Sequence, residues 1–345
     1  MKIEKFEIGQ DKVFIIAELS ANHNGDLNTA IKTIRAAKEA GADCIKLQTY
    51  TADTITIDSK LDDFTIKGTI WEGRNLYDLY KQAYTPWEWH EELFRVAKEE
   101  GLICFSSPFD KSAVDFLEDL NSPAYKIASF EITDIPLIEY VASKNKPIII
   151  STGIAEIEDI DLAIDTCEKM GNNNIALLKC TSSYPAPINE ANLCMIEDLK
   201  KRYNFPIGIS DHTIGFLSPI VSVSLGAKII EKHFILDKSL GGPDASFSMS
   251  KDEFKTMVKY VRDTEKILGD IDYNLTPKQT EGRNFSRSLY IVEDVKKGEI
   301  ITEHNIRSIR PGHGLHPKYF QELIGKTFSK DLKKGTRLSF DLIKD

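Results

Sequence analysis

The chain has 345 residues, of which 41% are hydrophobic and 28% are charged, and its formal net charge at pH 7 is −9. This length allows one large core with a small additional domain. The negative charge argues against a nucleic-acid-binding protein, and the apolar runs are too short for a membrane span or a signal peptide. We therefore expect a cytoplasmic protein without nucleic-acid or membrane partners.

Short apolar segments alternate with helical patterns from Val13 to about Ile267. The expected strands, in chain order, are Val13–Glu18, Cys44–Gln48, Ile103–Ser106, Ala124–Ile127, Pro147–Ser151, Ile175–Cys180, Pro206–Ser210 and Lys228–Glu231. A helical pattern follows each of these segments. The alternation predicts a (β/α)8 TIM barrel.

Capping residues indicate where several helices begin and end. The segment Asp26–Ala40 has an apolar stripe and stops at Gly41, a residue suited to a C-cap. Thr85 is expected to be the N-cap of a helix that starts with a proline and has a glutamate three residues after the cap. Ser250 and Glu253 form the same pattern before the eighth helix, which is expected to close the barrel.

The longest insertion between a strand and its helix is Thr49–Tyr84, which is polar and rich in aromatic residues. Because it follows the second strand, it could lie over the C-terminal rim of the barrel as a lid or a partner contact. The alternative is a surface excursion with a small helix of its own.

The pattern changes after Gly269. Residues 270–285 are polar and contain a proline, which predicts a linker between a catalytic barrel domain at 1–269 and a small domain at 286–345. Short strand-like pieces and basic turns predict that the small domain is rich in β-structure. A module of about sixty residues is only marginally stable alone, so we expect it to dock on another surface, such as a second subunit.

Two histidines stand near the ends of the last two predicted strands. In a TIM barrel the C-terminal strand ends meet at one rim, where the active site lies. His212 and His233 are therefore expected to face one pocket, and two imidazoles beside carboxylates suit a divalent metal ion. The alternative is that each histidine only makes local hydrogen bonds.

Lysines and hydroxyls occupy other positions at the same rim. Lys46 and Lys126, with Ser and Thr hydroxyls near helix N-termini, predict a site for a small dianionic substrate. Either lysine could instead be paired with a carboxylate, and the candidates are Glu18, Glu131 and Glu231. A metal beside a phosphorylated anion indicates a condensation or a release of phosphate.

Nine segments in order resemble the motifs of the sialic acid synthase family, also called nonulosonic acid synthases. They are AELSANHNGD at 17–26, IKLQTY at 45–50, SSPFD at 106–110, YKIASFEITDIP at 125–136, ISTGIA at 150–155, KCTSSYPAP at 179–187, ISDHT at 209–213, EKHF at 231–234 and GGPDASFSM at 241–249. The tail resembles the antifreeze-like (SAF) domain of that family. The resemblance implies a barrel enzyme that condenses phosphoenolpyruvate with an amino sugar and releases phosphate by C–O cleavage through a tetrahedral intermediate.

Within the family, some segments resemble one branch more than the others. They are GTIWEGRNLYDLYKQAYTPWEWH at 68–90, SSYPAP at 182–187, GGPDASFSM at 241–249 and RSIRPGHGLHPKY at 307–319. The acceptor implied by this branch is 2,4-diacetamido-2,4,6-trideoxy-L-altrose. The alternatives are the branches that make N-acetylneuraminate or legionaminate by the same mechanism.

The resemblance also implies roles for individual residues. His212 and His233 would bind Mn²⁺ or Mg²⁺ and act in catalysis with Glu18 and Glu131. The residues that match phosphoenolpyruvate contacts are Lys46, Ser107, Lys126, Ser129, Ser151, Ser182 and Ser210. The residues that would face the sugar are Asn22, Gln48, Tyr184, Asp244 and Arg310. Arg310 would reach the N-acyl group from a partner subunit, which implies a domain-swapped homodimer. Ser182 departs from the family pattern, in which sialic acid enzymes can have Asn, and this puts that contact in doubt.

Two other functional hypotheses remain open from the residues themselves. A metal-free aldolase could use Lys126 or Lys46 as a Schiff-base nucleophile, but the paired histidines would then have no role. A non-catalytic glycan-binding or ice-binding protein could use the barrel only as a carrier. The charged rim argues against this hypothesis, because unpaired polar groups on a passive scaffold would be costly.

Overall fold

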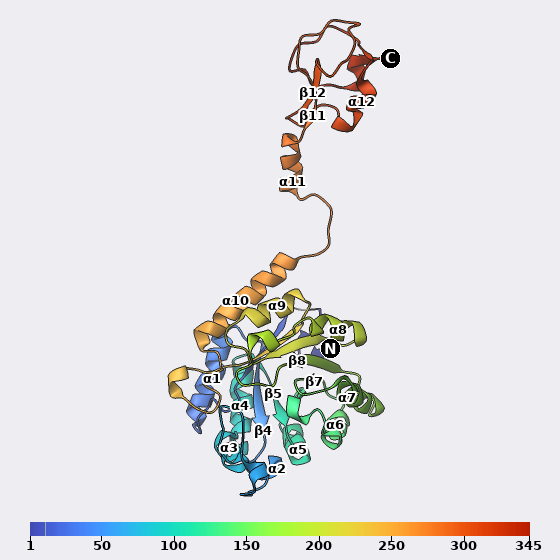
Figure 1. Cartoon of the computed structure of the whole chain (residues 1–345). Coiled ribbons are helices and arrows are strands. Elements are labelled where there is room, and N and C mark those ends of the chain that lie inside the picture. Colours follow the sequence, from blue (N-terminus) through green and yellow to red (C-terminus); the bar gives the residue numbers. More distant parts are fainter. Residues whose placement is uncertain (11) are drawn as a thin grey trace. The chain divides into compact units, whose positions relative to one another are not determined.

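The computed structural model describes residues 1–10 and 12–345. They form two compact units, Met1–Gly269 and Asp270–Asp345. In the first unit, helices surround a central set of strands (Figure 1). None of the helices in the described ranges combines the length and the apolar character needed to cross a lipid bilayer.

Parallel strands of the first unit close into a barrel in the order β10-β3-β4-β5-β6-β7-β8-β9. These strands are β3 (Phe14–Glu18), β4 (Cys44–Thr49), β5 (Ile103–Pro108), β6 (Tyr125–Ile127), β7 (Ile148–Ser151), β8 (Ile175–Cys180), β9 (Ile207–Asp211) and β10 (Ile229–His233). Every predicted strand is present, with ends within two residues of those expected. The predicted TIM barrel is confirmed.

The helices that follow the eight barrel strands form the outer layer of this unit (Figure 1). They are α1 (Leu27–Ala40), α4 (His90–Glu99), α5 (Lys111–Asp119), α6 (Ile135–Ala142), α7 (Ile157–Lys169), α8 (Met195–Arg202), α9 (Leu217–Ser224) and α10 (Lys251–Leu268). Asp26 caps α1, and Gly41 ends it with a φ of 95°, a conformation that glycine adopts easily. Ser250 and Glu253 form the predicted capping box of α10.

The prediction that Thr85 caps a helix is wrong. A 3₁₀ turn, Trp87–Trp89, comes first, and α4 begins only at His90. The Thr85 hydroxyl is fully buried and lies 3.3 Å from Nε2 of His23. Burial against this imidazole takes the hydroxyl away from the helix terminus, so the sequence pattern of an N-cap is present without its function.

Apolar side chains fill the N-terminal half of the barrel. A short antiparallel hairpin, β1 (Lys2–Ile3) with β2 (Phe6–Glu7), joins this core. Ile3 and Phe6 of the hairpin pack in one cluster with Phe14 and Phe105 of the barrel strands. The apolar packing closes this end, so the polar side chains of the barrel interior gather toward the C-terminal ends of the strands.

Gly208 in β9 shows how tightly the barrel wall is packed. A Cβ at this position would lie 2.5 Å from the carbonyl oxygen of Ile229 and 2.7 Å from a methyl carbon of Leu178. Because the backbone oxygen of Ile229 can move aside only at a high energetic cost, we expect Gly208→Ala to lower the free energy of unfolding by roughly 1–3 kcal/mol. Urea denaturation measures this change. Gly282→Ala, which meets no atom within 4 Å, is the matched control and should leave the urea midpoint unchanged.

The second unit has its own small core. It contains α11 (Pro277–Gly282), an antiparallel pair β11 (Ser288–Ile291) and β12 (Ile306–Ile309), α12 (Phe320–Leu323), and a second pair β13 (Thr327–Phe328) and β14 (Ile343–Lys344). The expected linker at 270–285 contains α11, which the sequence analysis missed. Pro277, which suggested a linker, is the first residue of this helix, and Thr276 caps it together with Gln279.

Candidate active site

Strand β10 brings alternate residues to the two faces of the barrel wall. Glu231 contacts Ser210 of the adjacent strand β9 and Lys46 of β4, and His233 lies beside the ring of His212. Lys232, between them, contacts a different set of groups. This alternation follows from the two-residue period of a strand, and it delivers Glu231 and His233 to the same rim.

A buried cluster of charges lies at the C-terminal rim. Lys46 Nζ is 2.8 Å from Glu231 Oε1 and 3.1 Å from Glu18 Oε2. Lys126 Nζ is 3.7 Å from Glu231 Oε1 and donates to Ser151 Oγ at 2.6 Å. The ion-pair alternative therefore holds for both lysines. Two ammonium groups share one firmly ionised carboxylate, so the cluster retains positive charge that a substrate anion can balance.

Burial and neighbouring charges shift the pKa values of this cluster. Burial raises the pKa of Glu18, whereas Lys126 and Lys46 outweigh burial at Glu231 and hold its pKa below the usual value. Burial lowers the pKa of Lys126 to about 8, but the carboxylate neighbours of Lys46 raise its pKa against burial. Burial also raises the pKa of Glu131 to about 7. A carboxyl group with this pKa can both accept and donate a proton near neutrality.

The two predicted histidines lie side by side, with ring centroids 5.3 Å apart. Nδ1 of His212 is 3.1 Å from the carbonyl oxygen of Thr181, and a hydrogen bond there leaves Nε2 free for another ligand. Nδ1 of His233 is buried without a hydrogen-bond partner, 3.7 Å from Oδ2 of Asp244. Burial lowers the pKa of His233 well below its usual value, which keeps this imidazole in the neutral form that binds metals.

The donor atoms fit a divalent ion only in part. Among the described residues, no three His, Cys, Asp or Glu side chains form a group that could hold a metal ion. Two imidazole nitrogens are available, one of them the unpartnered Nδ1 of His233. The residues therefore fit an ion that takes two ligands from the protein and the others from water or substrate oxygens.

Unpartnered polar atoms gather at this rim. In the described part of the chain, the buried side-chain atoms without a hydrogen-bond partner are Asn22 Oδ1, Ser107 Oγ, Glu131 Oε2, Glu231 Oε2, His233 Nδ1 and Glu18 Oε2, the last of which is in an ion pair with Lys46. All of them belong to C-terminal strand ends or to the loops that follow. A buried polar atom without a partner is costly, so their concentration here indicates a polar ligand.

Other predicted site residues are held in place by hydrogen bonds within the protein. Gln48 Nε2 donates to Glu18 Oε1 at 3.0 Å, and Asn22 Nδ2 donates to the carbonyl oxygen of Phe234 at 3.0 Å. The remaining contacts are Ser210 Oγ to Glu231 Oε1 at 3.0 Å, Gly153 N to Ser129 Oγ at 3.1 Å, Ala21 N to Asp244 Oδ2 at 3.3 Å, and Ser182 Oγ beside Cys180 Sγ at 3.8 Å. Arg310 belongs to the second unit, at the residue after β12.

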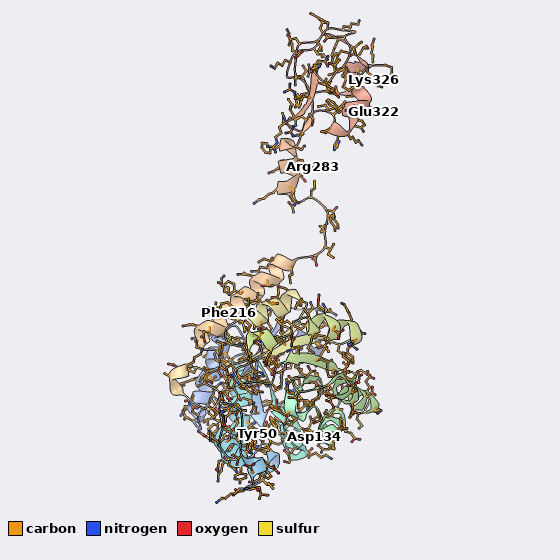
Figure 2. The ribbon with its side chains drawn as sticks, viewed as in Figure 1. Tyr50, Asp134, Phe216, Arg283, Glu322 and Lys326 are labelled. Carbon is orange, nitrogen blue, oxygen red and sulfur yellow. The ribbon has the colours of Figure 1, made fainter. Side chains whose placement is uncertain are left out.

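The insertion after β4 reaches the rim and also carries small helices, α2 (Ala52–Ile55) and α3 (Leu76–Ala83). Tyr50, labelled in Figure 2, packs edge-to-face on Tyr80 of α3. Trp71 donates from Nε1 to the carbonyl oxygen of Pro243 at 3.1 Å, and its ring lies 5.8 Å from that of Tyr184. Tyr184 in turn lies 4.4 Å from the His212 ring. The insertion therefore combines both alternatives, a surface segment with helices and a cover over part of the rim.

Several rim residues were missed as site residues. Glu231 was expected at the rim but was given no role beyond a possible ion pair, and Phe247, whose ring is 4.9 Å from that of His233, was given no role. Cys180 lies 3.6 Å from Nδ1 of His212. The two-residue alternation from His233 back to Glu231 could have identified the glutamate. The positions of Phe247 and Cys180 beside the histidines depend on loop geometry, which no local sequence pattern indicates.

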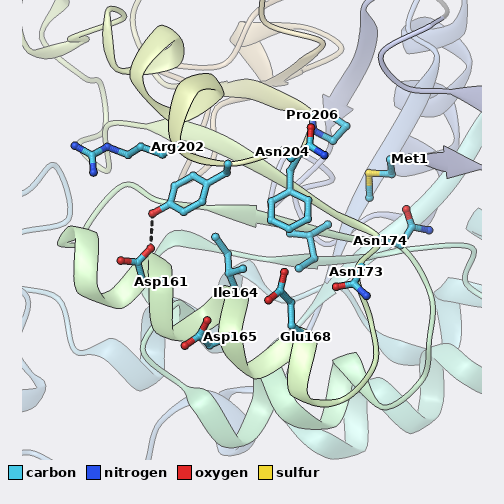
Figure 3. A pocket seen from close by; sticks show the side chains of 13 residues that line it. Met1, Asp161, Ile164, Asp165, Glu168, Asn173, Asn174, Arg202, Asn204 and Pro206 are labelled. Atoms are coloured by element: carbon cyan, nitrogen blue, oxygen red, sulfur yellow. Dashed lines mark hydrogen bonds between the residues drawn. The ribbon is translucent and has the colours of Figure 1, made fainter.

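A separate hollow of about 770 Å³ lies near the opposite end of the barrel (Figure 3). Its lining includes Ile175 and Pro206, at the N-terminal ends of β8 and β9, and acidic residues of α7. Tyr203 donates to Asp161 there at 2.6 Å. None of the unpartnered buried atoms lies in this lining. Size alone does not identify a site, and the unpartnered polar atoms favour the rim over this hollow.

A closed barrel with a buried, partly unpartnered set of lysines, carboxylates and histidines at its C-terminal rim defines a TIM-barrel enzyme. Comparison with known families gives a match to the NeuB family over residues 33–273 and to the SAF domain over 286–344. The chain belongs to the NeuB family.

Curated relatives and solved structures agree with this placement. The pseudaminic acid synthase of Campylobacter jejuni is 51% identical over 338 residues, which are 98% of each chain. The pseudaminic acid synthase of Helicobacter pylori is 51% identical over 95% of this chain and 96% of its own. The N-acetylneuraminic acid synthetase of Leptospira borgpetersenii is 32% identical, with a TM-score of 0.74 over 82% of this chain and 94% of that one.

Proposed function

We propose that this chain is a pseudaminic acid synthase. It would condense phosphoenolpyruvate with 2,4-diacetamido-2,4,6-trideoxy-L-altrose and release phosphate. The observation that carries the proposal is the rim cluster, in which buried lysines meet polar atoms without partners. The choice of sugar is supported by relatives of that name that are about half identical to almost the whole chain.

Phosphoenolpyruvate carries the negative charge that the rim cluster lacks. Lys46 and Lys126 attract its phosphate and carboxylate groups, and Glu231 holds both ammonium groups in place. The unpartnered hydroxyl of Ser107 can donate to a substrate oxygen. Ser210, which already donates to Glu231, extends the same polar surface.

His212 and His233 would hold the divalent ion, which we propose to be Mn²⁺ or Mg²⁺. When bound, the ion supplies Lewis-acid polarisation of the aldehyde oxygen of the open-chain sugar. The neutral state of buried His233 and the hydrogen bond at Nδ1 of His212 keep a nitrogen of each imidazole available. Their neighbours Tyr184 and Phe247 exclude water from one side of the pair.

The reaction forms one C–C bond and breaks one C–O bond. C3 of phosphoenolpyruvate attacks the aldehyde carbon, and positive charge develops at C2. Glu131, whose pKa is about 7, takes a proton from the water that adds to C2 and returns it to the former aldehyde oxygen. The tetrahedral intermediate then expels phosphate with its bridging oxygen, and the proton of the C2 hydroxyl leaves with it. Holding two substrates in line contributes up to roughly 7–11 kcal/mol to such a step.

Phosphate release from phosphoenolpyruvate tests the proposal. The enzyme is given Mn²⁺ and, separately, the diacetamido-trideoxy-altrose, N-acetylmannosamine and the legionaminate precursor. Release with the altrose sugar alone is the expected result, and ¹⁸O in the C2–O bridge should appear in the phosphate. Release with another sugar would contradict the acceptor. No release, together with borohydride trapping of Lys126 by pyruvate and resistance to chelator, would favour the aldolase.

Arg310 supplies a separate prediction. We propose that its guanidinium binds the N-acyl group of the acceptor within a domain-swapped homodimer. Because a hydrogen bond from a charged group contributes about 1.5–3 kcal/mol, Arg310→Ala should raise KM for the sugar by roughly 10–100-fold. KM for phosphoenolpyruvate should stay within about twofold. Steady-state kinetics with each substrate varied in turn makes the comparison.

Arg307→Ala is the matched control for Arg310, because Arg307 is also exposed and lies three residues earlier. It should leave both KM values unchanged. A larger effect of Arg310→Ala on the KM for phosphoenolpyruvate than on the KM for the sugar would place the arginine elsewhere.

Sedimentation of the full chain tests whether the protein is a homodimer. We propose a cytoplasmic location for the enzyme, because phosphoenolpyruvate is produced in that compartment.

A further inference from the structure

A buried ion pair lies on the strand face that the proposed reaction does not use. Lys232 Nζ is 2.5 Å from Asp211 Oδ2, and the two side chains are only 1% and 2% exposed. Because successive side chains of a strand point to opposite faces, Lys232 points away from the rim residues that its neighbours Glu231 and His233 contact. Neither member of the pair belongs to the charge cluster around Lys46.

The ion pair holds the turn after β9 from both sides. Asp211 Oδ1 accepts from the backbone N–H of Thr213 at 3.1 Å, and Asp211 Oδ2 accepts from the Thr213 hydroxyl at 3.2 Å. Lys232 donates to the Thr213 carbonyl oxygen at 2.6 Å. The residue between Asp211 and Thr213 is His212, so the backbone is fixed on each side of this histidine.

The same pair connects the two strands that carry the histidines. Lys232 and Asp211 are direct partners in the parallel register of β10 and β9. Lys232 immediately precedes His233, and Asp211 immediately precedes His212. The backbone carbonyl of His212 also accepts from Ala186 N at 3.0 Å, which leaves the turn little freedom. One buried contact thus fixes the backbone positions from which both imidazole side chains extend.

We propose that Asp211 and Lys232 are positioning residues that set the separation and orientation of His212 and His233 for a divalent ion. A buried ion pair is often no more stabilising than apolar side chains of similar size, so stability alone does not account for it. The groups that orient metal ligands typically change metal affinity by about 10–100-fold when they are removed. The inference rests on the proposed function, specifically on an ion bound by the two histidines.

Direct binding of Mn²⁺ to the metal-free full chain tests the inference without using activity. Free Mn²⁺ is followed by electron paramagnetic resonance for the wild type, Lys232→Met, Asp211→Asn and the double variant. We expect each single variant to raise the Kd for Mn²⁺ by about 10-fold or more. Because the two residues act as one pair, the Kd of the double variant for Mn²⁺ should be no higher than that of the single variant that binds Mn²⁺ less tightly.

Asp43→Asn is the matched structural control. Asp43 forms an ion pair with Arg262 at 2.9 Å, and the two side chains are 10% and 20% exposed. Asp43 directly precedes β4, at the N-terminal end of the barrel. This variant should lower Tm and leave the Kd for Mn²⁺ unchanged. If Asp43→Asn weakens Mn²⁺ binding as much as Lys232→Met does, the effect is general destabilisation, and the proposal is wrong.

The outcomes also separate this inference from the proposed function. A wild type that binds no Mn²⁺, or whose affinity survives His233→Ala, contradicts the metal site itself. A wild type that binds Mn²⁺ with the affinity of Lys232→Met and Asp211→Asn contradicts only the positioning role. Additive losses in the double variant would also contradict it. If a single variant fails to fold, the double variant, which has no unpaired buried charge, carries the comparison.

Discussion

Replacement of His233 by alanine should lower kcat with Mn²⁺ by about 10²–10³-fold, because Lewis-acid stabilisation of developing charge contributes several kcal/mol. The structural basis is the buried Nδ1 atom without a hydrogen-bond partner, beside the His212 ring. Since that nitrogen makes no hydrogen bond to another protein group, its removal should leave the barrel folded. Phosphate release at saturating substrate and Mn²⁺ titration by paramagnetic resonance measure the two effects.

His304 provides the matched control for this substitution, because it is exposed and lies in the second unit. His304→Ala should retain the kcat and the Mn²⁺ affinity of the wild type. The melting temperature of His233→Ala should stay within a few degrees of the wild type. Wild-type Mn²⁺ affinity in His233→Ala would remove this histidine from the ion site.

Acid should destabilise the barrel through two buried histidines outside the rim cluster. Burial lowers the pKa of His23 to about 4, and burial likewise lowers the pKa of His90 to about 4. His90 Nε2 is 2.9 Å from the hydroxyl of Thr49, and its Nδ1 is 3.2 Å from the carbonyl oxygen of Pro86. A second proton on this ring would break the contact in which the ring accepts.

The sign of the effect follows from the two pKa values of each histidine. The folded pKa is below the unfolded value of about 6.5, so the unfolded chain takes up the proton first as pH falls. Stability is therefore complete above about pH 6.5 and is lost as pH falls toward 4. A shift of about 2.5 units corresponds to roughly 3 kcal/mol for each buried histidine at the acid end of this range.

Urea denaturation of the wild type and His90→Gln at pH 7 and pH 4.5 tests this prediction. The loss of stability on acidification should be smaller in the variant by about 2–3 kcal/mol. Only the difference between the two proteins is interpreted, because the raised pKa values of Glu18 and Glu131 act in the opposite direction. Equal acid losses in the two proteins would show that His90 does not titrate. His316→Gln, on the second unit, should leave the acid loss unchanged.

The barrel could be predicted because each strand is a short apolar run between capped helices. Buried parallel strands have no polar alternation, so their limits are visible even where helices are short. The strand ends then indicated which residues share a rim, and the structure brings Lys46, Lys126, His212 and His233 together there. This step needed only the common direction of parallel strands.

What could not be predicted depends on side chains that meet across the sequence. The pattern around Thr85 is that of an N-cap, but its contact with His23 decides its role. Trp71 reaches Pro243 across 172 positions, and no local pattern indicates such a contact. The sharing of Glu231 between Lys46 and Lys126 depends on strand register, which hydrophobic patterning does not specify to the residue.

The alternation along β10 limits which insertions and deletions this chain can tolerate. Glu231 contacts Lys46 and His233 contacts His212 on the inner side of the wall, and Lys232 contacts Asp211 on the other side. A slip of one residue would exchange these faces and place the ammonium group of Lys232 where the imidazole of His233 now lies. A one-residue insertion or deletion within β10 should therefore be rejected in a mutational library. Changes of length in the insertion after β4 leave this register intact, so that segment can vary in length without moving Glu231 or His233.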